Sequence, residues 1–220
     1  MTIFQDELGN MWFGTREGLN IYDGNTIKIL QPKGKPENSL SGNLIKEISG
    51  DSQGSVFIHT QNGIDQYDLT SGTITHLITV QINAMNYGNN RLWYAKDNKI
   101  FVIDSKQTGF FCEIDHQAQI TAILPVSGNR LLVGTIASGV FSIDQNKNVK
   151  RVLPGCSRVA SIFEDSEKNA WISTWENGLY KITANNTIVN YRQNLKDPSK
   201  GLSSDFVRTV CEDDNGNIWI

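Results

Sequence analysis

The side chains best suited to bind a ligand lie in short polar segments that recur between strand-like stretches of the sequence. Amides and carboxylates in these segments can hydrogen-bond hydroxyl groups, and one aromatic side chain, Trp175, can stack on the face of a sugar ring. The candidate ligand-binding residues are Arg16, Glu17, Gln61, Asn62, Asp97, Trp175, Glu176 and Asn177. The chemistry that these residue types support is recognition of a carbohydrate.

The same residues have a second interpretation, which we favour on the sequence alone. Segments between strands are polar by default, because they run over the protein surface. In this interpretation the eight residues form turns, and Trp175 packs against the next structural unit.

No pattern in the sequence predicts a catalytic site, a metal site or a cofactor. Glu17 and Glu176 have no second acid at a spacing that reads as a glycosidase pair. His59 lies inside a predicted strand, where a core histidine hydrogen-bonded to a neighbour is the more common outcome. His76 and His116 stand alone. The cysteines are too far apart for a metal motif or a disulfide framework: Cys112, Cys156 and Cys211.

The composition excludes some classes of partner. The chain has 220 residues, of which 39% are hydrophobic, which is enough to bury a core. Its net charge of −3 argues against a nucleic-acid surface, which is normally basic. No apolar run reaches the length of a membrane helix, and the N-terminal segment lacks the basic and apolar regions of a signal peptide. We therefore expect neither nucleic-acid binding nor direct membrane contact.

A repeated motif organises the whole chain. An aspartate is followed six residues later by Trp or Phe in four places: Asp6/Trp12, Asp51/Phe57, Asp165/Trp171 and Asp213/Trp219. Two degenerate copies lack the aspartate, and the aromatic or apolar anchors of the six copies are Trp12, Phe57, Trp93, Leu132, Trp171 and Trp219. The anchors are about 40 residues apart, a period that is typical of propeller blades with four strands each.

The repeat predicts an all-β fold, a β-propeller of four-stranded blades, with about five and a half blades in a single domain. In each blade the aspartate caps the turn between the first two strands. The first strands of the blades are predicted near residues 2, 44, 81, 118, 158 and 206. The predicted blades span residues 1–38, 39–80, 81–117, 118–156, 157–200 and, truncated, 201–220.

Two positions of the repeat carry specific expectations. The residue two positions after the anchor is small in most copies, which would let neighbouring backbones approach closely, and His59 departs from this rule. In the fifth turn Lys168 occupies a slot that glycine fills elsewhere and that calls for a positive φ. We expect either that this turn reshapes around Asn169, or that Lys168→Gly stabilises the protein.

The motif resembles the two-component regulator propeller repeat, which has the form DxxGxxWxGTxxGLxxYD preceded by GLSSxxVxxI. The first copy carries the resemblance in Asp6, Gly9, Trp12, Gly14, Thr15, Gly18, Leu19, Tyr22 and Asp23. Matching residues of the later copies are Leu40, Ser41, Asn43, Ile45, Asp51, Gly54, Gly63, Tyr67, Asp68, Asp165, Trp171, Thr174, Gly178, Leu179, Leu202 to Val207, Asp213, Gly216 and Trp219.

The resemblance implies a function and a location. In that family the repeat builds the periplasmic sensor region of bacterial hybrid histidine kinases, with seven-bladed propellers followed by a β-sandwich, a membrane helix and a kinase core. This chain contains no phospho-accepting histidine motif and no ATP-binding lid, so we expect a non-catalytic sensor segment. Its expected partners are an oligosaccharide ligand and the remaining blades and β-sandwich of the parent sensor.

Two other functions stay open from the sequence. One is a structural or protein-interaction propeller, and the other is a propeller enzyme such as a lyase or glycosidase. The resemblance alone favours the sensor, because a fold supports many functions.

The sequence also leads us to expect an incomplete propeller. The sixth copy stops at "DDNGNIWI", after one strand and the start of a second, and seven blades would need about 280 residues. We expect the end blades to expose apolar faces and unpaired strand edges, through which the chain could associate with itself.

Overall fold

The computed structural model describes residues 2–33, 38–104 and 107–220. Within these ranges the elements are β-strands and one short 3₁₀ helix, η2 (Pro198–Lys200). This confirms the all-β fold that the repeat predicts. Alternating and fully buried strands rich in Ile, Val, Leu and aromatic residues account for it, because such residues suit a covered, pleated surface.

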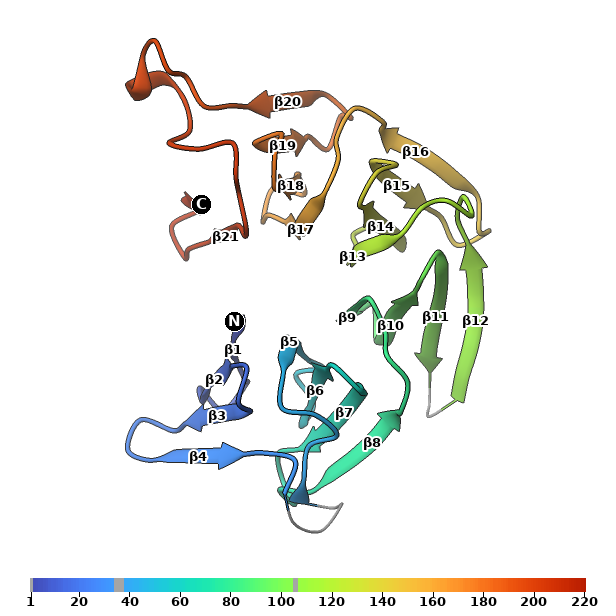
Figure 1. Cartoon of the computed structure of the whole chain (residues 1–220), viewed down its shortest axis with the longest axis vertical. Helices are drawn as coiled ribbons and strands as arrows, with labels where there is room; N and C mark the ends of the chain where they lie inside the picture. Colours follow the sequence, from blue (N-terminus) through green and yellow to red (C-terminus); the bar gives the residue numbers. More distant parts are fainter. Residues whose placement is uncertain (1, 34–37, 105–106) are drawn as a thin grey trace. The chain divides into compact units, whose positions relative to one another are not determined.

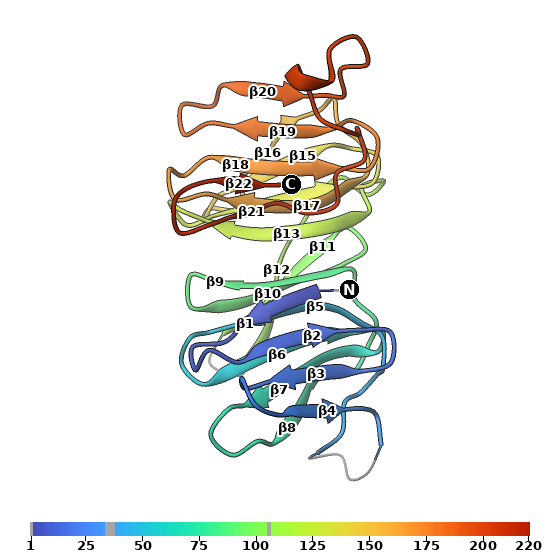
Figure 2. The ribbon, with the colours of Figure 1, turned by 90° about the vertical axis from the view of Figure 1, so that its left-hand side faces the viewer.

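Five four-stranded sheets of propeller-blade type make up most of the chain (Figure 1). In each sheet the strands are neighbours in the order in which they occur in the sequence, as Figure 2 shows for the first blade. The first three blades comprise β1 (Thr2–Gln5), β2 (Met11–Gly14), β3 (Leu19–Tyr22) and β4 (Ile27–Leu30); β5 (Ile45–Gly50), β6 (Ser55–Thr60), β7 (Gly63–Asp68) and β8 (Ile74–Ile78); and β9 (Ala84–Gly88), β10 (Arg91–Lys96), β11 (Lys99–Asp104) and β12 (Gln107–Glu113). The fourth and fifth comprise β13 (Ile120–Val126), β14 (Arg130–Thr135), β15 (Val140–Ile143) and β16 (Val149–Leu153); and β17 (Val159–Glu164), β18 (Ala170–Thr174), β19 (Leu179–Ile182) and β20 (Ile188–Tyr191).

The contacts divide the chain into two compact units. Unit 1 consists of Met1–Lys96 and Val102–Thr108, and unit 2 consists of Asp97–Phe101 and Gly109–Ile220. Within each unit the first strands of consecutive blades contact one another, as β1 contacts β5 and β13 contacts β17. The single-domain organisation and the blade boundaries given above stay predictions.

The sixth copy forms a short two-stranded ladder instead of the longer first strand that the sequence predicts. The prediction of a strand from residue 206 is wrong: β21 (Cys211–Glu212) begins five residues later and pairs with β22 (Ile218–Trp219). The register pairs Cys211 with Trp219, so residues before 210 have no opposite residue in the described chain to extend this ladder. Apolar side chains of this segment nevertheless pack on the fifth blade, in a cluster of Phe163, Trp171, Leu179, Leu202, Val207, Val210 and Ile218.

A hydrogen-bonded carboxylate explains the six-residue spacing between aspartate and tryptophan. One oxygen of Asp165 accepts a bond from the backbone N–H of Asn169 (2.7 Å), and the other accepts from the indole Nε1 of Trp171 (2.8 Å). Asp6 binds Trp12 (2.8 Å) in the same way. The predicted turn cap is confirmed, and the indole bond, which the sequence did not reveal, ties the turn to the buried anchor of the blade.

The copies without this bond hold their anchors differently. Asp51 caps its turn through the N–H groups of Gln53 and Ser55, while Phe57 stacks on Tyr87 of the third blade, with ring centroids 5.4 Å apart. In the third blade the indole of Trp93 donates to the carbonyl of Gly88 at 3.3 Å. The degenerate blades turn through two consecutive residues with positive φ: Asn89 and Asn90, and Gly128 and Asn129.

The small residues after the anchors stand where the next blade comes close. A β-carbon added to Gly14 would lie 2.7 Å from a side-chain carbon of Ile45, and one added to Gly134 would overlap the side chain of Val159. His59, which breaks the rule, is fully buried, and its Nδ1 lies 2.7 Å from the carboxylate of Glu47. The same carboxylate oxygen accepts the backbone N–H of Met85 (2.7 Å). The core position predicted for His59 is confirmed, although its Nε2 has no bond within the described residues.

Hydrogen bonds to the caps Asp165 and Asp213 lower the pKa of their carboxyl groups. Burial alone would raise the pKa of Asp165, but bonds from the Asn169 side chain, the Trp171 indole and the Asn169 backbone hold it below its ordinary value of 3.8. For the exposed Asp213, bonds from the Asn217 side chain, the Trp219 indole and the Asn217 backbone lower the pKa to about 2. The ionised form is therefore the form that the turn needs.

Replacing Trp171 with Phe should destabilise the protein by about 1.5–3 kcal/mol, the range for losing a hydrogen bond to a charged group that stays buried. Trp219→Phe is the matched control, because its indole makes the same bond to Asp213 at 2.9 Å but is exposed. Urea unfolding of both variants measures the difference. Equal losses of unfolding free energy would show that the buried carboxylate–indole bond has no special weight.

Lys168→Gly should stabilise the protein by up to about 1 kcal/mol, because Lys168 adopts a φ of 68° that costs a side-chain-bearing residue about 1–2 kcal/mol. The turn keeps the conformation of the glycine-containing turns. The N–H of Lys168 donates to the Asp165 carbonyl (2.9 Å), as the N–H of Gly9 donates to the Asp6 carbonyl (3.0 Å). The reciprocal variant Gly9→Lys has open space around the new side chain and should lose a similar amount. Thermal unfolding compares the two. A lower unfolding temperature for Lys168→Gly would contradict the strain argument.

Stability should fall as the pH drops below about 3.8, and Asp165→Asn should weaken this dependence. The unfolded Asp165 carboxyl takes up a proton at its ordinary pKa, whereas the folded one resists until a lower pH. Between those two pKa values the unfolded state binds more protons than the folded state. The contribution of Asp165 to the free energy of unfolding is therefore complete above pH 3.8 and is lost as the pH falls through the lowered pKa. Unfolding free energies measured from pH 2 to 6 give the slopes. Identical slopes for wild type and variant would exclude this role.

Candidate ligand-binding cavity

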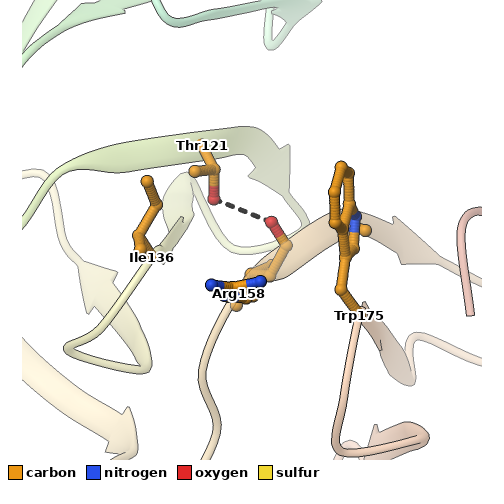
Figure 3. A pocket seen from close by; sticks show the side chains of 6 residues that line it. Thr121, Ile136, Arg158 and Trp175 are labelled. Carbon is orange, nitrogen blue, oxygen red and sulfur yellow. Dashed lines mark hydrogen bonds between the residues drawn. The ribbon is translucent and has the colours of Figure 1, made fainter. Parts of the chain in front are cut away.

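A cavity of about 360 Å³ lies in unit 2, between the fourth and fifth blades (Figure 3). Its walls come from the start of the first strands and from the corners between the second and third strands. In the view of Figure 3, Arg158 lies between Ile136 and Trp175. The lining residues are Thr121, Ile136, Arg158, Val159, Ala160 and Trp175.

Backbone hydrogen bonds fix three of these residues relative to one another. The N–H of Arg158 donates to the carbonyl of Ile136 (2.6 Å), and the N–H of Trp175 donates to the carbonyl of Arg158 (3.1 Å). The hydroxyl of Thr121 donates to the carbonyl of Val159 (2.8 Å), as the dashed line in Figure 3 shows. The corner of one blade and the start of the next are thus held together by backbone groups, with the Thr121 hydroxyl as the one cavity-lining side chain that contributes a bond.

Trp175 is the aromatic wall of the cavity. Its side chain is 48% exposed, and its ring lies 5.5 Å from that of Phe206 at an angle of 47°. The indole therefore packs on the following segment, as the turn interpretation expects, and also lines the cavity. A half-exposed indole beside a cavity is suited to stack on an apolar ring face.

The charge at the cavity comes from Arg158. Its guanidinium lies 3.0 Å from the carboxylate of Glu176, and both side chains are 56% exposed. The Asn177 side chain, next in sequence, accepts bonds from the N–H and the hydroxyl of Ser157, both at 3.0 Å. Of the three candidates in this corner, Trp175 lines the cavity, Glu176 reaches it through Arg158, and Asn177 holds the preceding loop.

The remaining candidate residues lie in other corners, away from the cavity. Gln61 accepts the N–H of Leu44 (2.7 Å), and Asn62 donates to the carbonyl of Ser41 (2.6 Å), both in unit 1. Arg16 and Glu17 are exposed residues of the first corner in the same unit. Asp97, in unit 2, has a φ of 56°, and its carbonyl accepts the N–H of Ile120 (3.0 Å). The structure does not gather the eight candidates around the cavity, and their role in binding stays a prediction.

Sequence reasoning missed Arg158 as a site residue. It lies in the connection between two blades, a type of segment that commonly lines the binding face of a propeller. Its pairing with Glu176 and its positive φ of 49° arise from tertiary structure. The available signal was its position just before a predicted first strand.

A second polar group lies in the second blade. Asp65 is fully buried and accepts bonds from the backbone and hydroxyl of Ser41 (2.7 and 3.0 Å). It also lies 2.7 Å from Nδ1 of His76 on the neighbouring strand. These partners satisfy the carboxylate and fix β7 against β8. In the part of the chain that the structure describes, no cluster of three or more His, Cys, Asp or Glu side chains has the geometry of a metal site.

Known proteins that resemble this chain include a histidine kinase, a domain of a two-component system and a lyase. A 39-residue stretch is 51% identical to Histidine kinase P4 of Formosa agariphila, covering 18% of this chain and 3% of that protein. A solved domain described as the extracellular part of the hybrid two-component system BT3049 from B. thetaiotaomicron is 18% identical, with a TM-score of 0.63 over 99% of this chain and 38% of that chain. A streptogramin B lyase is 17% identical, with a TM-score of 0.77 over 100% of this chain and 74% of the lyase.

These likenesses differ in what they show. The two solved structures have sequence identities below 20%, so they show only that the fold is shared with this chain. The chain spans a small fraction of the curated kinase and about two fifths of the two-component system domain.

The described residues form no helix that is long and apolar enough to cross a membrane.

A family model covers nearly the entire sequence, from residue 9 to residue 215. Its description is "Domain of unknown function (DUF5074)". The resemblance to the two-component regulator propeller repeat stays a prediction beside this match. On the extent of the match, the chain belongs to the DUF5074 family.

Proposed function

We propose that this chain is the ligand-sensing propeller segment of an extracytoplasmic two-component sensor, and that the cavity beside Trp175 is its ligand site. The observation that carries the proposal is a half-exposed indole on an apolar cavity of ligand size at the corner of two blades. The likeness to a sensor extracellular domain and to a histidine kinase supports the sensory role. The kinase module and further blades would lie in other parts of the parent protein.

The proposed ligand is an oligosaccharide. An indole stacks on the apolar face of a pyranose ring, and the adjacent guanidinium of Arg158 can hydrogen-bond its substituents. The cavity opens at the end of the blades where corners of neighbouring blades meet, so a chain of sugar units can extend along the surface. We also propose a periplasmic location, as the sensor resemblance implies.

An enzymatic role has a specific observation in its favour, the fold shared with streptogramin B lyase. The cavity itself argues against it. Among the described residues that line it there is no carboxylate, imidazole or thiol to act as general acid or base. A structural or protein-interaction propeller is the remaining alternative, and ligand binding distinguishes it from the sensor.

Trp175→Ala should weaken oligosaccharide binding at least tenfold while lowering the melting temperature little, because the side chain is half exposed. Trp175→Phe keeps a ring for stacking and should retain most of the affinity. A glycan array identifies a binder, and calorimetry with that oligosaccharide measures the variants.

Leu195→Ala is the matched control, because Leu195 is an exposed apolar residue outside the cavity, and it should change neither quantity. Unchanged affinity of Trp175→Ala together with a large fall in melting temperature would assign Trp175 to packing on Phe206. Binding of no glycan by the wild type would refute the proposed ligand class.

A further inference from the structure

We infer that the cavity selects an acidic oligosaccharide, one that carries a carboxylate or sulfate group, and that Arg158 is the residue that recognises the anionic group. This inference rests on the proposed function, because it names the ligand class of the same site. It assigns to Arg158 a specificity role that its place in the turn does not require.

Arg158 is the charged residue among the six described residues that line the cavity. The hydroxyl of Thr121, the other polar group there, already donates to the Val159 carbonyl. Ile136, Val159 and Ala160 offer only apolar surface. A ligand that enters therefore meets an aromatic wall, an apolar floor and one guanidinium, whose planar fork matches a carboxylate or sulfate with two parallel hydrogen bonds.

The backbone at Arg158 is strained. Its φ of 49° lies in the left-handed region, which favours glycine and asparagine over a long side chain. Most other non-glycine residues with positive φ are Asn, Asp or Ser, or lie in hairpin turns. Strain of this kind is concentrated at binding sites, where it aims a side chain at its target. Here both backbone polar groups of Arg158 are bonded to the two corners that flank the cavity, so the conformation is held in place.

The present partner of Arg158 is easily replaced. Glu176 and Arg158 are both more than half exposed, and ion pairs between such side chains contribute little net stability. Glu176 does not line the cavity. A ligand carboxylate or sulfate that enters beside Trp175 can take over the guanidinium, and Glu176 then returns to solvent. Without a ligand, Glu176 neutralises the site, so a neutral sugar gains less from Arg158 than a charged sugar does.

Matched sugars with and without the charged group test this inference on the 220-residue chain. The probes are a galacturonic acid tetramer and its fully methyl-esterified form, and a sulfated galactose tetramer and its desulfated form. Calorimetry at low ionic strength should show at least about tenfold tighter binding of one charged form than of its neutral counterpart, and added salt should reduce the difference. The two pairs distinguish a carboxylate from a sulfate as the recognised group.

Three variants assign the effect to Arg158. Arg158→Gln should remove the preference for the charged sugar and its salt dependence, and Arg158→Lys should restore part of it. Glu176→Gln, which removes the competing carboxylate, should strengthen binding of the charged sugar several-fold. Arg151→Gln is the control, because it deletes another half-exposed arginine of unit 2, which pairs with Asp115 and does not line the cavity.

The outcomes separate the inference from the proposed function. Equal affinity for charged and neutral sugars, lost in Trp175→Ala, would keep the sugar site and overturn the acidic specificity. A charge preference that persists in Arg158→Gln would also overturn it. Binding of none of the four probes would overturn the acidic specificity, and binding of no glycan on the array would refute the proposed function as well. If Arg158→Gln fails to fold, Glu176→Gln decides, since unchanged affinity for the charged sugar contradicts competition at the guanidinium.

Discussion

The bond between a turn carboxylate and a buried indole is the interaction on which the first and fifth blades depend. A carboxylate buried without partners would be costly, and a buried indole N–H needs an acceptor. Asp165 and Trp171 solve both problems at once, and the same carboxylate orders the turn through Asn169. The Asp165 carboxylate thus connects the turn, the paired strands on either side of it and the buried indole of the core. The second blade shows that an aromatic stack can replace the indole bond, since Phe57 uses Tyr87 instead.

The next level of order comes from backbone bonds between consecutive blades within each unit. A residue at the start of one copy of the repeat donates an N–H to the corner of the preceding blade, as Ile45 does to Thr15 and Val207 does to Thr174. The Arg158–Ile136 bond belongs to this series, so the cavity is built from the general mechanism that attaches one blade to the next. What distinguishes this corner is the side chains that it carries, an indole and a guanidinium.

The features that follow from local periodicity could be predicted from the sequence, and those that follow from three-dimensional neighbours could not. The aspartate-to-aromatic step gave the strands, the capped turns and the close approach at Gly14 and Gly134, because each depends on residues near in sequence or on the repeat. The start of β21 was misplaced, because a ladder needs residues opposite it as well as β-forming residues. Arg158 was missed because its φ and its pairing with Glu176 depend on contacts between blades.

The two ends of strand β18 contact different parts of the structure. Near the start of this strand (Ala170–Thr174) Trp171 donates to the buried carboxylate, and just after its end Trp175 borders the cavity. Substitutions at the cavity end leave the carboxylate network untouched, so natural selection can vary the cavity-lining side chains without first having to restore folding. Each further copy of the repeat offers another such corner. A propeller of this kind can therefore diversify its surface, one corner at a time, on an unchanged frame.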